Sequence, residues 1–316
     1  MSVDRINYLN IGLMLGSLAL AFAAPFEVFL FSYALLAPLH YFTEIAWLHQ
    51  RQYFSPGRYD FIWLGFLAAC MFLTQFIVTD LDFLTASLVA LAFFLPLTFL
   101  LVKKRVYRFI SIFLILLGVV LLSDFRWYFV LFAVFMTTII HTFVFTGLFI
   151  LHGALKKATV TGLASLVVYI LCVAACFLIV PTTGVPELSR FFQEAYSGFW
   201  VMNSELMRLL SYPFQGVDDL YDSAGALMVM RFVTFVYLYH YMNWFSKTSL
   251  IGWHRSSKAS LVVVFLTWAL CLSMFLYDYR LGVMVIYFFS MLHVFLEFPL
   301  NHQTMLGIGR ILLGRM

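Results

Sequence analysis

Long apolar segments alternate with short polar connections along almost the whole chain. Ten of these segments are close to the ~20 helical residues that cross the apolar core of a bilayer. They are continuously apolar and do not alternate with polar residues, which predicts helices and not the strands of a membrane barrel. The expected helices span approximately residues 8–24, 26–48, 60–78, 83–102, 106–123, 127–151, 159–180, 224–246, 259–277 and 281–300.

The composition leads to the same class of protein. Hydrophobic residues make up 64% of the 316 residues, and charged residues only 11%. A water-soluble globule could not bury so large an apolar share. We therefore predict an all-α, polytopic integral membrane protein whose residues 1–316 form a single transmembrane domain. The membrane that we expect is the inner, cytoplasmic membrane of a bacterium.

The basic residues indicate the orientation of the bundle. If ten helices alternate in direction, 14 of the 19 Lys and Arg residues lie on the side that carries both termini, and most acidic residues lie opposite. Cytoplasmic loops of membrane proteins carry an excess of Lys and Arg, so both termini are predicted to be cytoplasmic. The net charge of +4 then reflects topology, and nucleic acid is not an expected partner.

One long connection, residues 181–223, interrupts the series of short loops. Apolar residues recur at helical spacing within 185–212, with acids and arginines between them. This pattern predicts one or two amphipathic helices on the outer membrane surface. A role as a lid over the bundle is favoured over a direct role in an active site.

The eight histidines follow the predicted topology closely. His40, His141, His240 and His293 fall inside four helices that run from the outside inward, while His49, His152, His254 and His302 lie near the cytoplasmic ends of the same helices. The first four lie six to ten residues before those ends, which corresponds to roughly 9–15 Å of depth. They are therefore predicted to form one layer near the cytoplasmic face.

Polar neighbours accompany these four histidines. Glu44 and Glu297 each follow a histidine at i+4, so each shares a helical face with it. Asn243 lies three residues after His240. Imidazole nitrogens with carboxylates are typical of metal sites in helix bundles, so these histidines and both glutamates are candidate metal ligands. The alternative is that each histidine bonds to a neighbouring helix and holds no metal.

The donor set narrows the choice of metal. Imidazole and carboxylate ligands without thiolate suit iron, zinc, manganese or copper(II). One iron with the glutamates in an outer shell, or two irons if His49 and His302 take part, both agree with the pattern. Zinc more often has three protein ligands and an open water position.

The histidine cluster resembles known membrane enzymes in kind. Membrane fatty-acid desaturases and hydroxylases, which bind two irons, also gather histidines near the cytoplasmic face, although their His-x-x-x-His boxes are absent here. The four-histidine layer is similar to that of bacterial carotene dioxygenases. Alkaline ceramidases and the progestin and adiponectin receptors are similar in holding zinc among spanning helices. No continuous stretch carries any of these similarities, so no family is assigned.

These observations lead to one leading hypothesis and two alternatives. The first is a membrane oxidoreductase in which iron acts on a lipid or isoprenoid substrate. A separate electron donor would supply the electrons. Glu44 and Glu297 would act in catalysis, and Tyr237, Tyr241 and Asn243 would line the pocket. The second is a zinc-dependent intramembrane lipid hydrolase. The third, of another class, is a haem b electron carrier or a transporter coupled to ions or protons.

Overall fold

The computed structural model describes residues 2–77, 82–181, 187–247 and 258–314, and no strand occurs among them. Polar caps mark several helix starts: Ser2, Thr159 and Ser223 each accept a hydrogen bond from a main-chain NH in the first turn. Asp278 caps the last helix in the same way. Pro25 occupies the first position of the second helix, where a missing NH costs nothing. The all-α prediction is confirmed for the described residues.

The long helices follow the expected order. Their bounds are α1 (Val3–Ala23), α2 (Pro25–Gln50), α3 (Asp60–Phe76), α4 (Asp82–Leu101), α5 (Arg105–Leu122), α6 (Arg126–Phe129), the π-helix η2 (Val130–Phe145), α7 (Thr146–Lys157), α8 (Val160–Leu178), α12 (Ala224–Ser246), α14 (Lys258–Tyr277) and α15 (Tyr279–Leu312). The shorter elements are η1 (Gln52–Phe54), α9 (Arg190–Tyr196), η3 (Ser197–Phe199), α10 (Trp200–Leu209) and α11 (Asp219–Asp222).

Eight of the described helical stretches are long and apolar enough to cross a membrane. They are α1, α2, α4, α5, α8, α14, α15 and the continuous stretch from α6 through η2 to α7. Two predicted spans differ from these. α3 is shorter, with 17 residues, whereas α12 has 23 residues but carries more polar side chains. The count of ten spans therefore stays a prediction, and a helical membrane bundle is what the structure supports.

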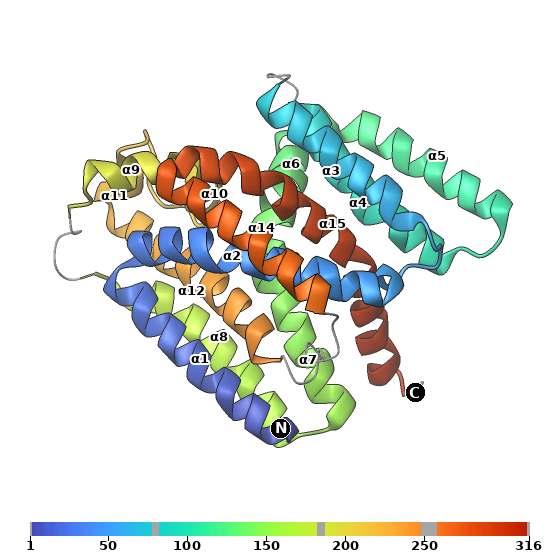
Figure 1. Cartoon of the computed structure of the whole chain (residues 1–316), viewed down its shortest axis with the longest axis horizontal. Helices are drawn as coiled ribbons and strands as arrows, with labels where there is room; N and C mark the ends of the chain where they lie inside the picture. The colour runs from blue at the N-terminus through green and yellow to red at the C-terminus, as the bar shows by residue number, and fades with distance from the viewer. Residues whose placement is uncertain (1, 78–81, 182–186, 248–257, 315–316) are drawn as a thin grey trace.

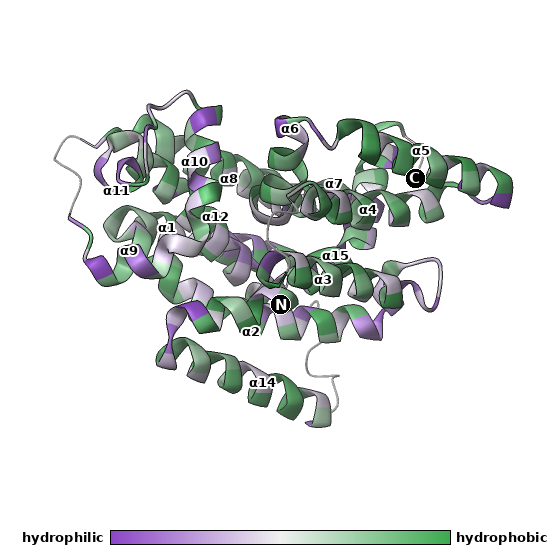
Figure 2. Ribbon diagram, turned by 90° about the horizontal axis from the view of Figure 1, so that it is seen from above, coloured by the Kyte–Doolittle hydropathy of each residue, from purple (hydrophilic) through white to green (hydrophobic). Residues whose placement is uncertain are grey.

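The bundle has two distinct ends (Figure 1). The start of α1 lies at the bottom centre of that view and the end of α15 at the lower right, whereas α9 and α11 lie at the upper left. Figure 2 shows apolar residues along the long helices, while many of the hydrophilic ones lie near helix ends and in connections. Both chain ends thus lie at one end of the bundle. Which side of the membrane this end faces remains a prediction from the charges.

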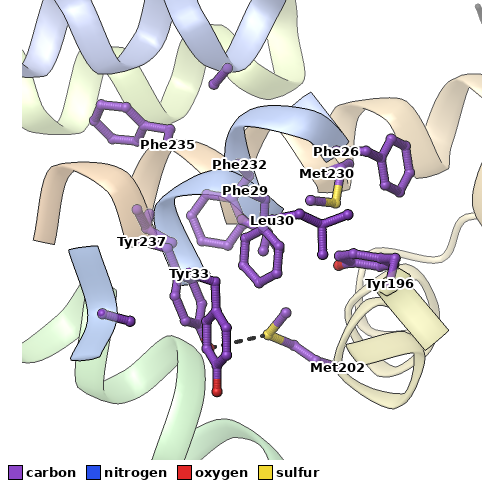
Figure 3. Close-up of a cluster of buried hydrophobic side chains, with 14 of the residues drawn as sticks. Phe26, Phe29, Leu30, Tyr33, Tyr196, Met202, Met230, Phe232, Phe235 and Tyr237 are labelled. Atoms are coloured by element: carbon purple, nitrogen blue, oxygen red, sulfur yellow. Dashed lines mark hydrogen bonds between the residues drawn. The ribbon is translucent and has the colours of Figure 1, made fainter. Parts of the chain in front are cut away.

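α12 forms the centre of the bundle, in contact with α1, α2, α8, η2 and α10. Most of its side chains are buried, including the polar ones. One apolar cluster joins α12 to α1, α2, α8, α9 and α10. Figure 3 shows part of this cluster, with Phe29, Tyr33 and Tyr237 close to Met202. A second cluster joins α3, α4, η2 and α15. In contrast, α5 has no buried residue and lies at the edge of the bundle (Figure 1).

The long connection forms helices, as the sequence predicts, although residues 182–186 lie outside the described part of the chain. Its position differs from a helix that only rests on the membrane surface. Asn203 and Met207 of α10 are fully buried, because α10 packs against α12 and η2. Glu205 then anchors α10: Arg126 of α6 and Arg208 both bond to its carboxylate, at 2.6 and 2.7 Å. α10 is therefore part of the bundle.

Candidate metal centre

The four predicted histidines meet inside the bundle. His40 comes from α2, His141 from η2, His240 from α12 and His293 from α15, and each is between 1% and 7% exposed. One ring nitrogen of each lies within 4.8 Å of the other three, a grouping that could hold a metal ion. Sequence spacing had placed these residues at one depth, and the packing of four helices now brings their side chains together.

The imidazoles form a closed ring of four, which we call the histidine ring. Neighbouring ring centroids are 4.7 Å apart for His40 and His240, 4.8 Å for His240 and His141, 4.9 Å for His141 and His293, and 5.4 Å for His293 and His40. Neighbouring planes are steeply inclined, by 65° to 83°. Two pairs of Nε2 atoms approach closely, at 3.0 Å between His240 and His40 and 3.1 Å between His293 and His141.

Three of the four Nδ1 atoms face a polar partner outside the ring. His293 Nδ1 lies 3.3 Å from the carbonyl oxygen of Phe289, and His240 Nδ1 lies 2.9 Å from the hydroxyl of Thr146. His141 Nδ1 lies 3.1 Å from Glu297 Oε2, although the contact lacks the in-plane geometry of a regular hydrogen bond. His40 Nδ1 has no hydrogen-bond partner among the described residues. Such outer partners fix the tautomer of metal-binding histidines.

The tautomer of His293 follows from what its outer partner is able to do. A main-chain carbonyl only accepts hydrogen bonds, so Nδ1 of His293 carries the hydrogen. In the neutral imidazole, Nε2 then presents its lone pair. This lone pair points into the ring, toward Nε2 of His141 at 3.1 Å, where it can accept a proton or bind a metal ion.

The two glutamates occupy different positions at this ring. Glu44 Oε2 lies 3.2 Å from Nε2 of His40, the nitrogen that faces the centre, whereas Glu297 lies on the outer side of His141. Both carboxyl groups are buried, and they share a hydrogen bond. Asn301 donates a further hydrogen bond of 3.4 Å to Glu297. Glu44 is therefore placed to join a central ion, and Glu297 to orient a ligand of that ion.

A lysine adds positive charge near the glutamates. Lys247 follows directly after α12, and it interacts electrostatically with Glu297. Burial lowers the pKa of Lys247 to about 8, while the nearby Glu297 carboxylate acts in the opposite direction. Near neutral pH this ammonium therefore keeps its proton less firmly than an exposed lysine does.

The structure does not bring the other candidate ligands into the histidine ring. His49 is exposed and pairs with the hydroxyl of Tyr53 at 3.0 Å. His302 is fully buried against Phe93, at 4.6 Å between ring centroids, and its two nitrogens have no partner among the described residues. Asn243 accepts a hydrogen bond from Tyr239. No contact among the described residues therefore supports a second metal site formed by His49 and His302. His254 lies outside the described residues.

Several neighbours of the ring had no signal in the sequence. Tyr41 stacks on His293, with 4.0 Å between centroids, and Trp244 meets His40 edge to face at 5.6 Å. The indole of Trp244 also donates a hydrogen bond of 3.0 Å to Thr43. Tyr41 follows His40 directly, and adjacent residues of a helix do not share a face. Its contact with another helix could not be inferred from spacing.

A cavity of about 290 Å³ opens next to the histidine ring. His141, His240 and His293 line it, together with Gly198, Phe199, Val201 and Met202 of η3 and α10. The two predicted pocket tyrosines, Tyr237 and Tyr241, belong to its wall, whereas Glu44 and Glu297 do not. The glutamates and the cavity thus approach the ring from different sides.

Comparison of the chain with protein-family models, with curated proteins and with solved structures found no match. The residues of the site are therefore the basis on which its function is argued.

Proposed function

We propose that the protein is a membrane-embedded oxidoreductase in which the histidine ring holds a single iron ion that acts on a lipid or isoprenoid substrate. The observation that carries the proposal is the gathering of four buried imidazoles, with one ring nitrogen of each within 4.8 Å of the other three. The carbonyl oxygen of Phe289 holds the proton of His293 on Nδ1, which leaves the Nε2 lone pair facing the centre. This arrangement supports a cation bound between the four nitrogens.

The charges of the site fit a divalent ion. Four neutral imidazoles contribute no charge, whereas Glu44 and Glu297 contribute two negative charges once a bound cation has displaced the proton that the two carboxyl groups share. Both carboxyl groups are almost fully buried. Buried ionised groups are stable only when they are paired or coordinated. One divalent ion therefore balances the charge of the two carboxylates, which suits their position inside a membrane bundle.

The ligand number favours iron over zinc. Four Nε2 atoms and Glu44 supply five candidate ligands, and imidazole with carboxylate suits iron. A tetrahedral ion with bonds of about 2.1 Å would hold all its nitrogens about 3.4 Å apart. Here two Nε2 pairs are closer, at 3.0 and 3.1 Å, as expected for higher coordination. The zinc-dependent lipid hydrolase is the alternative that metal analysis distinguishes.

A haem is the less suitable cofactor. The four imidazoles contact one another at 4.7 to 5.4 Å between neighbouring centroids. A porphyrin plane would have to separate the two axial histidines of each haem, and contacts this close leave no room for it. The histidine ring therefore fits a single ion better than it fits the haem b of an electron carrier.

In this proposal each residue has a distinct task. Iron would supply one-electron redox chemistry with dioxygen. Glu297 holds the His141 ring in place, while Thr146 does so for His240. Tyr41, stacked on His293, limits the movement of that imidazole and lines the cavity. The substrate would reach His141, His240 and His293 through the cavity, and electrons would come from a separate donor.

The first experiment measures bound metal. The protein is purified in detergent, and the metal content, the optical spectrum and the consumption of oxygen are determined for the wild type, His293→Ala and His141→Ala. We expect about one iron per chain, with loss of nearly all of it in both variants. His49→Ala is the matched control, because His49 pairs with Tyr53 outside the ring. A wild type without stoichiometric metal contradicts the proposal, and stoichiometric zinc favours the hydrolase.

A further inference from the structure

The cavity lies on one side of the histidine ring only. On α15 its lining residues precede His293 or include it, and on α12 they begin at Tyr237, one turn before His240. The glutamates instead lie one turn beyond their histidines, at i+4. In the predicted topology the cavity therefore faces the outer side of the membrane, and the glutamates face the cytoplasm.

The wall of the cavity carries none of the four side chains that are usually charged at neutral pH. Among the described residues that line it, none is Lys, Arg, Asp or Glu. A phosphate or carboxylate that entered this space would find no Lys or Arg to pair with, and in the proposed centre Glu44 and Glu297 already balance the divalent ion, so the anion would remain a costly buried charge. Glycerophospholipid headgroups and free fatty acids are therefore poorly matched to it.

Hydroxyl groups are instead abundant in this wall. Tyr33, Tyr41, Tyr237, Tyr241 and Tyr287 all line the cavity. Two of them make long hydrogen bonds: the hydroxyls of Tyr41 and Tyr241 are 3.5 Å apart, and Ser290 donates to Tyr41 at 3.4 Å.

Figure 3 shows Tyr237 beside Met202, whose sulfur accepts from the Tyr237 hydroxyl at 3.7 Å. A thioether sulfur is a weak acceptor, and hydrogen bonds of this length are weak. These hydroxyls therefore retain the capacity to bind an oxygen atom of a ligand.

Apolar side chains form another part of the wall, beside Gln75 and the threonines at 85, 137, 138 and 142. Phe129, Ala133 and Val134 come from α6 and η2, Val201 from α10, and Val283 from α15. A ligand that fills this space needs an apolar body next to its oxygen-bearing group, because apolar surface is stabilised by apolar contact. The wall thus combines apolar contact with uncharged donors and acceptors.

We propose that the cavity takes an uncharged, apolar molecule that carries a hydroxyl or carbonyl oxygen, and that this class supplies the substrate of the metal centre. The inference rests on the proposed function, since it names the substrate class of the same site. Val201 and Met202 of α10 form part of the cavity wall. The tyrosines bind the oxygen of the ligand, and the apolar wall holds its hydrocarbon.

Four probes with one chain length test the class. Binding of 1-decanol, decane, decanoate and decyl phosphate to the detergent-purified protein is measured by native mass spectrometry near pH 7.5, and bound metal is determined on the same samples. We expect 1-decanol to bind at concentrations at least tenfold lower than either anion. Equal binding of decanoate or decyl phosphate overturns the inference.

Two variants place the binding in this cavity. Ala133→Phe adds a ring to its wall and should weaken 1-decanol at least tenfold, whereas Val120→Phe, on the exposed surface of α5, should not. Tyr241→Phe keeps the ring and removes one hydroxyl, so it should weaken 1-decanol several-fold and leave decane unchanged. If neither Ala133→Phe nor Tyr241→Phe weakens the binding of 1-decanol, the inference is overturned.

The metal data separate the two proposals. Selective binding of 1-decanol to a protein without metal would support this inference and contradict the proposed function. Stoichiometric iron together with equal binding of the anions would do the reverse.

Discussion

The two sides of the histidine ring differ in their chemistry although the same four helices build both. On one side, Glu44 and Glu297 contact His40 and His141, with Lys247 nearby. On the other side, tyrosine hydroxyls and apolar groups surround a cavity without an ionised acid or base. In our proposal this one layer of residues separates two tasks. One side would balance the charge of an ion, and the other would receive a neutral molecule.

The largest effect on metal binding is expected for Glu44→Gln. This substitution removes both a candidate ligand and one of the two charges that balance the ion. Leaving a buried charge unpaired costs about 3–5 kcal/mol, which corresponds to a loss of metal affinity on the order of 100-fold or more. The metal affinity is measured as the metal that the protein retains during dialysis against increasing concentrations of a chelator. The control is Glu194→Gln, which affects only an exposed pair with Arg190, and unchanged affinity in Glu44→Gln would refute the assigned role.

Glu297→Gln should have a smaller effect on the same measurement. The amide can keep the contact with His141 Nδ1, and Lys247, with a pKa of about 8, can release its proton to offset the lost negative charge. Loss of an outer-shell partner of a ligand typically lowers metal affinity by about 10–100-fold. If Glu297→Gln costs more than Glu44→Gln, the two glutamates have the opposite roles.

Thr146→Val tests one neutral outer-shell contact. It removes the hydroxyl that lies 2.9 Å from His240 Nδ1, while the size of the side chain stays similar. A hydrogen bond of this kind contributes about 1 kcal/mol, so metal affinity should fall roughly fivefold. Thr267→Val is the matched control, because the Thr267 hydroxyl bonds only within α14, far from the site. Equal behaviour of the two variants would show that Thr146 does not orient His240.

The smallest effect on metal is expected for Tyr41→Phe on the cavity side. Phenylalanine keeps the stack on His293 and removes only the hydroxyl that contacts Ser290 and Tyr241. Iron content should therefore remain within about twofold of the wild type, because the lost contacts are weak hydrogen bonds. Binding of 1-decanol should weaken in the same samples. If Tyr41→Phe loses iron but binds 1-decanol as the wild type does, the Tyr41 hydroxyl serves the metal and not the ligand of the cavity, which contradicts the prediction.

Much of the fold was accessible from the sequence because a bilayer requires long apolar helices. Eight described helical stretches have that length and composition, and they follow the predicted order. α12 was harder to classify, since its polar residues serve the interior of the bundle. The position of α10 was not predicted in full: its amphipathic pattern indicated a surface helix, whereas Glu205 and its arginine partners fix it against α6 and α12.

The site was predictable only along each helix. Spacing of 3.6 residues per turn puts Glu44 on the face of His40, and Glu297 on the face of His293. Yet Glu297 contacts His141 from another helix, and Thr146 contacts His240 across the bundle. Such contacts depend on how helices rotate and cross, which the repeat of a single helix does not specify.

The sequence by itself thus indicated a bundle of long apolar helices, the placement of four histidines on four of them and two carboxylates one turn from a histidine. Their physical basis is local: apolar length, charge asymmetry and helical periodicity. The tertiary structure alone decided that the four rings close around one centre, which nitrogen of each faces inward, and that a neutral cavity lies opposite the glutamates. These features depend on packing between helices that are distant in the chain, where side-chain shape sets the relative rotation.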